Sequence, residues 1–453
     1  MATINVNELM LAFDSLCVYR NLINDRVIKK LYELGVLVYR KEPGADEFIR
    51  KYNEFFFELA NSSSIQSLKE HVIKLILFDE NPFSRQSEKL PFDSINEILI
   101  DAASKDLDRL YYISCITSDV LKEYALENIC TCEVEKRFVN SLPAWDFENI
   151  RGYEQKKLSH NCEKITDIFT SRSNWGECVK YLSDFYYTNG CGIFARYNAF
   201  VWEPAEGEPS LRGIESPDPI CLSDFIGYEQ ERLEVIENTE KFVRGLPANN
   251  VLLYGDRGTG KSSTVKAIAN EYKDQGLRII EIPRKYLVDF PAVLRMIKGR
   301  NCKFIVFIDD LAFEDSEESY TVLKSVLEGG VENRPDNVLI YATSNRRHLI
   351  KEKFSDRAGL RTVDHDDEVR AKDTQQEKLS LSERFGITVI FSSPDKKRFL
   401  QIVEGLVAKR GINIDKDRLQ REAMRWELMY NGRSARTARQ FVDWLEGSEN
   451  LRK

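Results

Sequence analysis

The residues best suited to chemistry are Gly255–Ser262, which read GDRGTGKS and match the pattern G-x-x-x-x-G-K-[ST] in full. Backbone N–H groups at the start of a helix can cradle a phosphate when side chains stay out of the way, which favours glycine in such loops. The Lys261 ammonium can reach the outer phosphates, and the Ser262 hydroxyl suits a Mg²⁺ ion. A glycine-rich turn that arose by chance is the alternative.

The segments on either side of this loop must position it. Val251–Tyr254 is a short apolar run that predicts a buried strand, and Val265–Tyr272 is helix-forming. A strand, a glycine loop and a helix in this order are the context that the motif requires. The residues that we expect to form the polyphosphate site are Gly255, Asp256, Arg257, Gly258, Thr259, Gly260, Lys261, Ser262 and Ser263.

Acidic and amide side chains follow two further predicted strands. Lys303–Asp310 is an apolar run that ends in two aspartates, and Asn345 comes shortly after the apolar run Asn337–Thr343. Strands of a parallel sheet end at the edge where ligands bind. We expect Asp309 to hold the Mg²⁺ shell, Asp310 to act as a base or orient water, and Asn345 to touch the γ-phosphate or water. A helix-capping aspartate pair and a turn-forming asparagine are the structural alternatives.

Length and composition bound the class of protein. The chain has 453 residues, 42% of them hydrophobic, and a net charge of −8, which indicates two to four domains with substantial cores. No apolar run reaches the roughly 18 residues of a membrane span, and the N-terminus lacks the features of a secretory signal. The negative charge argues against a protein permanently coated on nucleic acid, although it allows a local basic channel.

The nine cysteines fit a protein that we expect to be cytoplasmic, where thiols stay reduced. Cys130 and Cys132, together with His160 and Cys162, could in principle form a zinc site. Because the usual spacing of zinc ligands is missing, buried free thiols are the favoured interpretation.

The order of patterns along the chain predicts four segments. Residues 1–202 indicate a mostly helical domain, 203–218 a linker rich in Pro, Gly and Glu, 219–392 an αβα core with a parallel sheet, and 393–453 a helical lid. In the first segment a helical stripe starts at Ile65, and Ser62–Ser64 could cap it. Its aromatic residues favour core packing over stacking on bases or partners. We find no catalytic constellation there.

Two other stretches admit more than one interpretation. Ile226 and Gly227 form a turn shortly before the phosphate loop, where they could pack on a nucleotide base or simply enter the domain. Ser355–Leu381 is long and charged, which favours a solvated loop over a metal site. The acidic residues of that stretch are Asp364, Asp366, Asp367 and Glu368.

Together these pieces resemble an AAA+ ATPase from Asp224 to Leu445. More closely, the sequence is similar to the bacterial ATP-binding family catalogued as domain of unknown function 815, and the similarity is carried by LLYGDRGTGKSSTVKA, FIDDLAFE, ATSNRRHL, KEKFSDR, QEKLSLSERFG and GRSARTARQFVDWL. The resemblance implies ATP and Mg²⁺ as cofactors. It also implies that Arg384 completes a neighbour's site, with a surface salt bridge as the alternative. Arg436, rather than Arg433, is expected to be the lid arginine. A homo-oligomer, either a ring or a filament, is therefore expected.

The function that follows is Mg²⁺-dependent ATP hydrolysis coupled to remodelling or loading of a macromolecule, which residues 1–202 would bind. AAA+ proteins usually end the second motif in Asp-Glu, whereas this chain has Asp309-Asp310; the shorter side chain predicts slow turnover. A nucleotide-gated binding module with little or no turnover is the alternative. A small-molecule kinase is disfavoured because no acceptor-binding constellation is seen, and nothing indicates a membrane or nucleic acid as the partner.

Overall fold

The computed structural model describes residues 6–39, 44–62, 67–145, 160–204, 210–311, 317–328, 334–345, 384–430 and 432–450. The charged stretch at 355–381, with its acidic cluster, lies outside these described residues. Contacts divide the chain into two compact units, Met1–Arg196 and Tyr197–Lys453.

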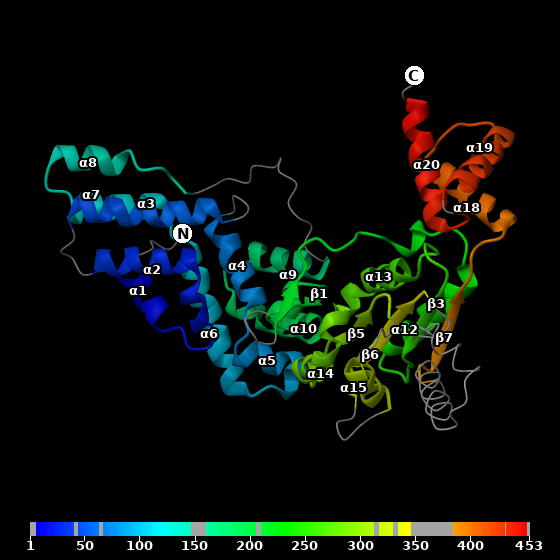
Figure 1. The fold of residues 1–453 in the computed structure, drawn as a ribbon. Helices are drawn as coiled ribbons and strands as arrows, with labels where there is room; N and C mark the ends of the chain where they lie inside the picture. The colour runs from blue at the N-terminus through cyan, green and yellow to red at the C-terminus, as the bar shows by residue number, and fades with distance from the viewer. Residues whose placement is uncertain are drawn as a thin grey trace. The chain divides into compact units, whose positions relative to one another are not determined.

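The described part of the first unit is helical, as predicted for the N-terminal region. Short 3₁₀ turns such as η1 (Arg20–Asn24) join some of its helices. The helices, blue to green in Figure 1, are α1 (Val6–Asp14), α2 (Arg26–Tyr39), α3 (Ala45–Asn61), α4 (Leu68–Phe78), α5 (Pro82–Lys89), α6 (Glu97–Ser114), α7 (Ser118–Asn128), α8 (Glu133–Asn140), α9 (His160–Ser171), α10 (Val179–Asn189) and α11 (Ile193–Arg196).

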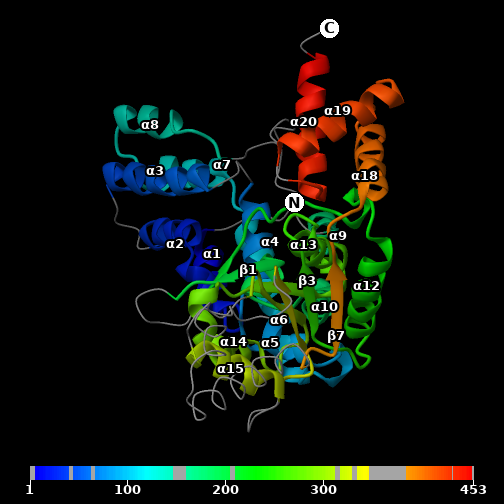
Figure 2. The same cartoon turned by 45° about the vertical axis from the view of Figure 1, so that its right-hand side comes forward.

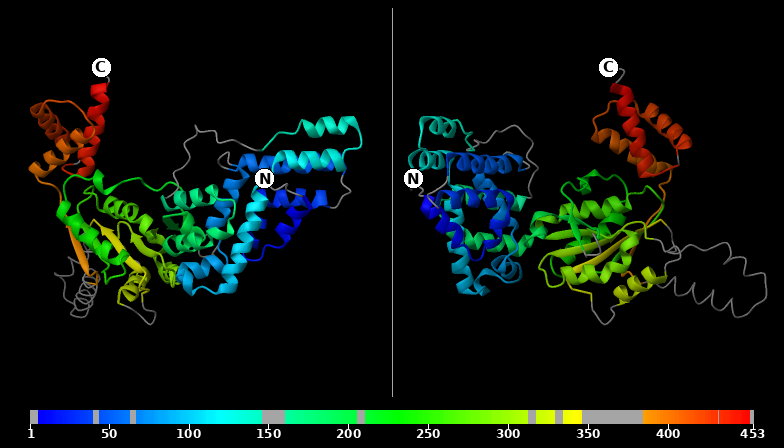
Figure 3. Two further views of the ribbon diagram at one scale, coloured as in Figure 1. Left: turned by 180° about the vertical axis from the view of Figure 1, so that it is seen from behind. Right: turned by 60° about the vertical axis from the view of Figure 1, so that its left-hand side comes forward.

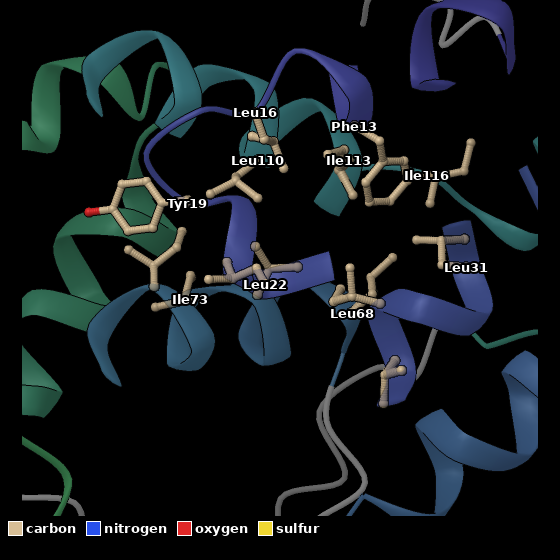
Figure 4. Packing of buried hydrophobic residues seen from close by; sticks show 14 of the residues in the cluster. Phe13, Leu16, Tyr19, Leu22, Leu31, Leu68, Ile73, Leu110, Ile113 and Ile116 are labelled. Carbon is tan, nitrogen blue, oxygen red and sulfur yellow. The ribbon is translucent and has the colours of Figure 1, made fainter. Parts of the chain in front are cut away.

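The apolar faces of these helices share one core. Figure 4 shows Leu16, Leu22, Leu68 and Leu110 converging from four separate segments, and all four side chains are buried. Burial of large aliphatic side chains contributes roughly 1.5–3 kcal/mol for each one. Apolar packing is therefore the main stabilising interaction among the described helices of this unit.

The start of α4 differs from the prediction. The helix begins at Leu68, and the Ser67 side chain caps it by accepting a hydrogen bond from the Glu70 N–H at 3.2 Å. Ser62 instead follows the last residue of α3, so it belongs to the end of one helix and not to the start of the next.

The second unit is built on a single sheet. Among the described residues the strand order is β2-β1-β4-β5-β6-β3-β7, and neighbours are parallel except for β1 and β2. The strands are β1 (Ala199–Trp202), β2 (Leu211–Gly213), β3 (Val251–Gly255), β4 (Leu277–Glu281), β5 (Lys303–Ile308), β6 (Val338–Ser344) and β7 (Ile387–Phe391).

Helices cover both faces of this sheet. α12 (Glu229–Val243) and α13 (Lys261–Glu271) lie on one face, and α14 (Phe290–Ile297) and α15 (Glu317–Glu328) lie on the other (Figures 1 and 3). Strands covered on both faces are continuously apolar, and all seven residues of β6 are buried.

Three C-terminal helices complete the second unit. α18 (Lys396–Lys409), α19 (Lys416–Met429) and α20 (Ala435–Asn450) gather beyond the carboxyl ends of β3 and β7 (Figure 2). The predicted fold class is confirmed: a helical N-terminal region precedes a P-loop NTPase core with a mainly parallel sheet, and helices follow that core.

Two strands lie where the sequence suggested the end of one domain and a linker. β1 falls within the segment expected to close the N-terminal domain, yet it pairs with β4 through Phe200 and Ile280. β2 falls within the expected linker, 203–218, and pairs with β1. The boundary between the two compact units lies between Arg196 and Tyr197. These strands are too short to show a period-2 pattern, and sheet hydrogen bonds stabilise them despite the turn-rich composition.

Other compositional expectations concern cysteines and membranes. All nine cysteines lie in the described ranges, and none forms a disulfide. Within those ranges no group of three or more His, Cys, Asp or Glu side chains is arranged to hold a metal ion. None of the described helices has both the length and the apolar character needed to cross a bilayer.

Candidate functional site

The glycine loop joins the carboxyl end of β3 to the start of α13. Gly255 has φ +137°, and a Cβ there would lie 2.1 Å from the Phe391 carbonyl oxygen at the end of β7. Gly260 precedes α13 with φ +97°, which residues bearing a side chain rarely adopt. Glycine at both positions lets the loop close tightly between strand and helix.

Lys261 is the first residue of α13, and its side chain is buried. Its ammonium donates to the carbonyl oxygens of Gly255 (2.9 Å) and Asp256 (2.7 Å) and to Asn345 Oδ1 (3.0 Å). Burial lowers the pKa of Lys261 to about 8, although the carboxylate of Asp256 and those after β5 act in the opposite direction. A bound polyanion would favour the charged lysine again, so the site is electrostatically suited to an anion.

The carboxylate of Asp309 collects hydrogen bonds from two other elements. Its Oδ1 accepts from Ser262 Oγ on α13 at 2.6 Å and from Thr343 Oγ1 on β6 at 2.5 Å. A hydroxyl and a carboxylate held this close are the oxygen donors that Mg²⁺ prefers. The residues present therefore fit the metal that the sequence motif implies.

Asn345 links the lysine to the second aspartate. Its amide oxygen accepts from Lys261, and its Nδ2 donates to Asp310 Oδ1 at 2.6 Å. Asp310 has φ +51°, and its N–H donates to Thr343 Oγ1 at 2.9 Å. The structure thus brings Lys261, Ser262, Asp309, Asp310 and Asn345 into one hydrogen-bonded cluster at the carboxyl edge of the sheet.

The turn before α12 lies between the glycine loop and the C-terminal helices. A Cβ at Gly405 of α18 would lie 2.7 Å from Ile226, and a Cβ at Gly260 would lie 3.7 Å from the Phe225 ring. Gly227 has φ +76°, which explains the glycine at this turn. Phe225 is a neighbour of the loop that the sequence patterns do not single out.

Arg436, near the start of α20, lies beside the glycine loop. Its N–H donates to the Gly258 carbonyl oxygen at 3.0 Å. Burial is the main cause of the lowered pKa of Lys261, and the positive charge of Arg436 adds to it. Arg433 is engaged elsewhere, because its Nε lies 3.3 Å from Glu427 Oε1.

Arg384 is not brought to this cluster. It precedes β7, and β7 runs parallel to β3 with Phe391 opposite Gly255. Arg384 therefore lies near the amino edge of the sheet, at the end of β7 opposite Phe391 and Gly255. Its guanidinium forms an ion pair with Glu328 at the end of α15.

Thr343 is the functional neighbour that sequence patterns missed. It is buried, donates to Asp309 and accepts from the Asp310 N–H. The sequence could have indicated this role, because alternate residues of a strand lie on the same face and Thr343 lies two residues before Asn345.

A family model described as "Protein of unknown function (DUF815)" matches residues 195–449. The chain belongs to this family. The match spans more than half of the chain and covers all the residues of the cluster. The family resemblance expected from the motifs is therefore confirmed.

Curated relatives carry names from the proteasome. The chain is 30% identical over 141 residues to the 26S proteasome regulatory subunit 4 homolog of Saccharomyces cerevisiae, which covers 27% of this chain and 32% of the yeast protein. It is 30% identical over 176 residues to the proteasome-activating nucleotidase of Methanothermobacter thermautotrophicus, covering 32% and 42%. A putative 26S proteasome regulatory subunit homolog of Methanocaldococcus jannaschii is 24% identical over 344 residues, covering 65% and 91%. The chain thus spans about a third of the length of the yeast relative.

Solved structures of Thermotoga maritima RuvB are also similar. The structure titled as the Holliday junction branch migration motor matches with a TM-score of 0.30 and 14% identity, over 50% of this chain and 72% of that one. A structure of a point variant of the same RuvB protein matches with a TM-score of 0.31 and 16% identity, over the same shares.

We predict that Lys261 makes stability rise with pH in the protein free of nucleotide and Mg²⁺. Its folded pKa of about 8 lies below the ordinary value of 10.5. Above about pH 8 the unfolded chain therefore holds a proton that the folded lysine has released, so this contribution grows as the pH rises. Urea midpoints measured in EDTA from about pH 7 to about pH 10 should rise more for the wild type than for Lys261→Met. Parallel profiles would contradict this prediction.

We also predict that Thr343→Val destabilises the fold. Valine has the same shape but removes the donor to Asp309 and the acceptor for the Asp310 N–H, so unfolding free energy should fall by ~1–2 kcal/mol. Urea denaturation measures the change. Thr343→Ser, which keeps the hydroxyl, is the matched control and should lose less than the valine variant. Unchanged stability of Thr343→Val would contradict a supporting role of the hydroxyl.

Proposed function

We propose that this protein binds ATP with Mg²⁺ and hydrolyses it. The observation that carries the proposal is the contact between Ser262 and Asp309, 2.6 Å apart although they come from different sequence motifs. A hydroxyl from the phosphate loop and a carboxylate from the neighbouring strand end are the two groups needed beside a metal-bound polyphosphate. The fold and the named relatives support an AAA+-type nucleotide-binding domain.

In this proposal the residues from Gly255 to Ser263 hold the phosphates. Their backbone N–H groups and the helix start favour negative charge. Lys261, freed from the carbonyl oxygens that it now contacts, pairs with the outer phosphates. Ser262 and Asp309 would hold Mg²⁺, which supplies positive charge to the phosphate oxygens when it is bound.

Asp310 and Asn345 are the residues proposed to orient the attacking water. Asp310 Oδ1 and Asn345 Nδ2 already lie 2.6 Å apart. Because phosphoryl transfer depends on positioning and on electrostatic stabilisation, a carboxylate and an amide suffice for this task. The short Asp310 side chain favours slow turnover. Arg436 would add positive charge from the helices that follow the core, as a guanidinium can pair with two phosphate oxygens.

The adenine base is proposed to lie against Ile226 and Gly227. These residues face α18, so the base would lie between the core, 219–392, and the lid, 393–453. The aliphatic side chain of Ile226 offers an apolar contact for one face of the ring. A cytoplasmic location with reduced thiols remains part of this proposal.

We further propose a homo-oligomer, a ring or a filament, that remodels or loads a macromolecular partner. Arg384 lies at the sheet edge opposite its own phosphate loop, where only another subunit's nucleotide would benefit from its charge. Proteins named as proteasome regulatory subunits and as a proteasome-activating nucleotidase are among the relatives. The helical unit formed by the first 196 residues is the candidate region for holding the partner.

A nucleotide-gated binding module is the second candidate. Asp310 is hydrogen-bonded to Asn345 and its N–H to Thr343, so the proposed catalytic carboxylate is already engaged. If this pairing persists with ATP bound, the protein would switch the state of its partner without appreciable turnover.

Lys261→Ala is predicted to weaken ATP binding at least about a hundredfold, because a buried charge that meets the phosphates is lost. Isothermal titration with Mg²⁺ and a non-hydrolysable ATP analogue measures the affinity. Asp310→Asn is the matched control: it should bind normally and hydrolyse slowly. Retained tight binding by Lys261→Ala would refute the phosphate assignment, and unchanged hydrolysis by Asp310→Asn would point to another group.

Arg384→Ala is predicted to remove the dependence of ATPase rate on protein concentration. In the wild type the rate per subunit should rise as subunits associate, because Arg384 then reaches a neighbour's phosphates. Glu328→Gln breaks the same ion pair but keeps the arginine, so it should behave like the wild type. A wild-type rate that is independent of concentration, or equal losses in the two variants, would count against a role in the neighbouring site.

A further inference from the structure

The connection between the sheet and the C-terminal helices is held by the phosphate loop. β7 ends at Phe391 and α18 begins at Lys396, and we call residues 392–395 the hinge. The Asp256 N–H donates to the Phe391 carbonyl oxygen at 3.0 Å. The Ser393 N–H donates to Asp256 Oδ2 at 2.7 Å. One residue of the phosphate loop therefore contacts both the end of the sheet and the hinge.

The same residue also contacts the lysine of the loop. Its carbonyl oxygen accepts from the Lys261 ammonium at 2.7 Å and from Thr259 Oγ1 at 2.9 Å. Asp256 thus has hydrogen bonds at its N–H, its carbonyl and its carboxylate. A continuous path of hydrogen bonds runs from Lys261 through Asp256 to Ser393.

On its other side the hinge is held by α12 and the residue before it. Tyr228, directly before α12, donates its hydroxyl to the Ser392 carbonyl oxygen at 2.7 Å. Arg398, in the first turn of α18, lies over the Tyr228 ring at 4.0 Å. It also donates to both carboxylate oxygens of Glu231 at 2.8 and 2.9 Å. The start of α18 is therefore anchored to the core by an ion pair, in which one guanidinium nitrogen contacts both carboxylate oxygens, and by a cation–π contact.

Phosphate binding does not explain why the side chain at position 256 is a carboxylate. A carboxylate repels the anion that this loop is proposed to hold. The hydrogen bond from Ser393 lowers the pKa of Asp256, so the negative charge persists. Asp256 is exposed, so solvent screens part of this repulsion, and the contact with the hinge offsets it further.

We propose that Asp256 is a positioning residue that couples occupation of the phosphate loop to the hinge and hence to the helices that carry Arg436. The proposal rests on the proposed function, since it concerns the same site. When Lys261 turns to a phosphate, the Asp256 carbonyl keeps only its hydrogen bond from Thr259 Oγ1, and the anion repels the Asp256 carboxylate. Both changes act on the hydrogen bond to Ser393. Because α18 follows the hinge directly, a shift there moves α18–α20 relative to the glycine loop.

Hydrogen–deuterium exchange on the full chain tests this coupling. Backbone exchange is compared with and without Mg²⁺ and the non-hydrolysable analogue adenylyl imidodiphosphate, at saturating ligand. In the wild type we expect slower exchange at 255–262 together with a change at 392–398. One hydrogen bond of about 1 kcal/mol corresponds to about a fivefold change in exchange rate.

Two variants distinguish transmission of ligand binding to the hinge from a purely structural role of Asp256. Asp256→Ala removes the acceptor for Ser393. At a ligand concentration raised until the exchange at 255–262 no longer changes, this variant should show no ligand-dependent change at 392–398. Asp256→Asn keeps an acceptor oxygen but loses the charge, so its hinge response should lie between that of the wild type and that of Asp256→Ala.

The outcomes distinguish the two proposals. An equal hinge response in Asp256→Ala and the wild type would overturn the coupling and leave the proposed function intact. Protection at 255–262 without a hinge response in the wild type would also overturn the coupling and leave the proposed function intact. This result comes from the wild type alone, so it does not depend on whether the variants fold. No protection at 255–262 in the wild type would overturn the proposed function, and the coupling with it.

Discussion

One carboxylate oxygen joins the parts of this site. Asp309 Oδ1 accepts hydrogen bonds from Ser262 on α13 and from Thr343 on β6, while Asp309 itself follows β5. These bonds form only if β5 and β6 are adjacent and parallel and α13 begins beside their ends. The carboxylate stays compatible with partial burial because hydroxyl donors replace the water that it loses. The sheet order and the proposed chemistry therefore depend on the same few atoms.

The position of β3 between β6 and β7 extends this arrangement to the rest of the second unit. On one side of β3 the loop lies beside the acidic strand ends. On the other side Gly255 lies next to the Phe391 carbonyl. The loop consequently contacts both the proposed catalytic groups and the hinge of the C-terminal helices. A ligand that reorganises the loop would act on both sides at once, which is how a small chemical change can become a movement of whole helices.

In the first unit, the sequence pattern does not show which aromatic side chains are buried. Phe55 and Phe57 belong to one aromatic run, yet Phe55 is fully buried and Phe57 is 64% exposed. The phase of α3 decides which ring enters the core, so composition alone cannot distinguish packing from a binding surface. The long aliphatic periodicity of this unit was enough to predict helices, because helical faces repeat every three or four residues.

Local sequence determined the glycine loop, the strand before it, the helix after it and the acidic strand ends, because each depends on neighbours within a few residues. Tertiary structure alone decided that Thr343 supports Asp309, that Arg384 pairs with Glu328, and that Asp256 holds Ser393. These partners are 34, 56 and 137 residues apart in the chain, so no local pattern links them. The formation of β1 and β2 likewise depends on tertiary pairing. Hydrogen bonds to a neighbouring strand outweigh the weak strand preferences of three or four residues.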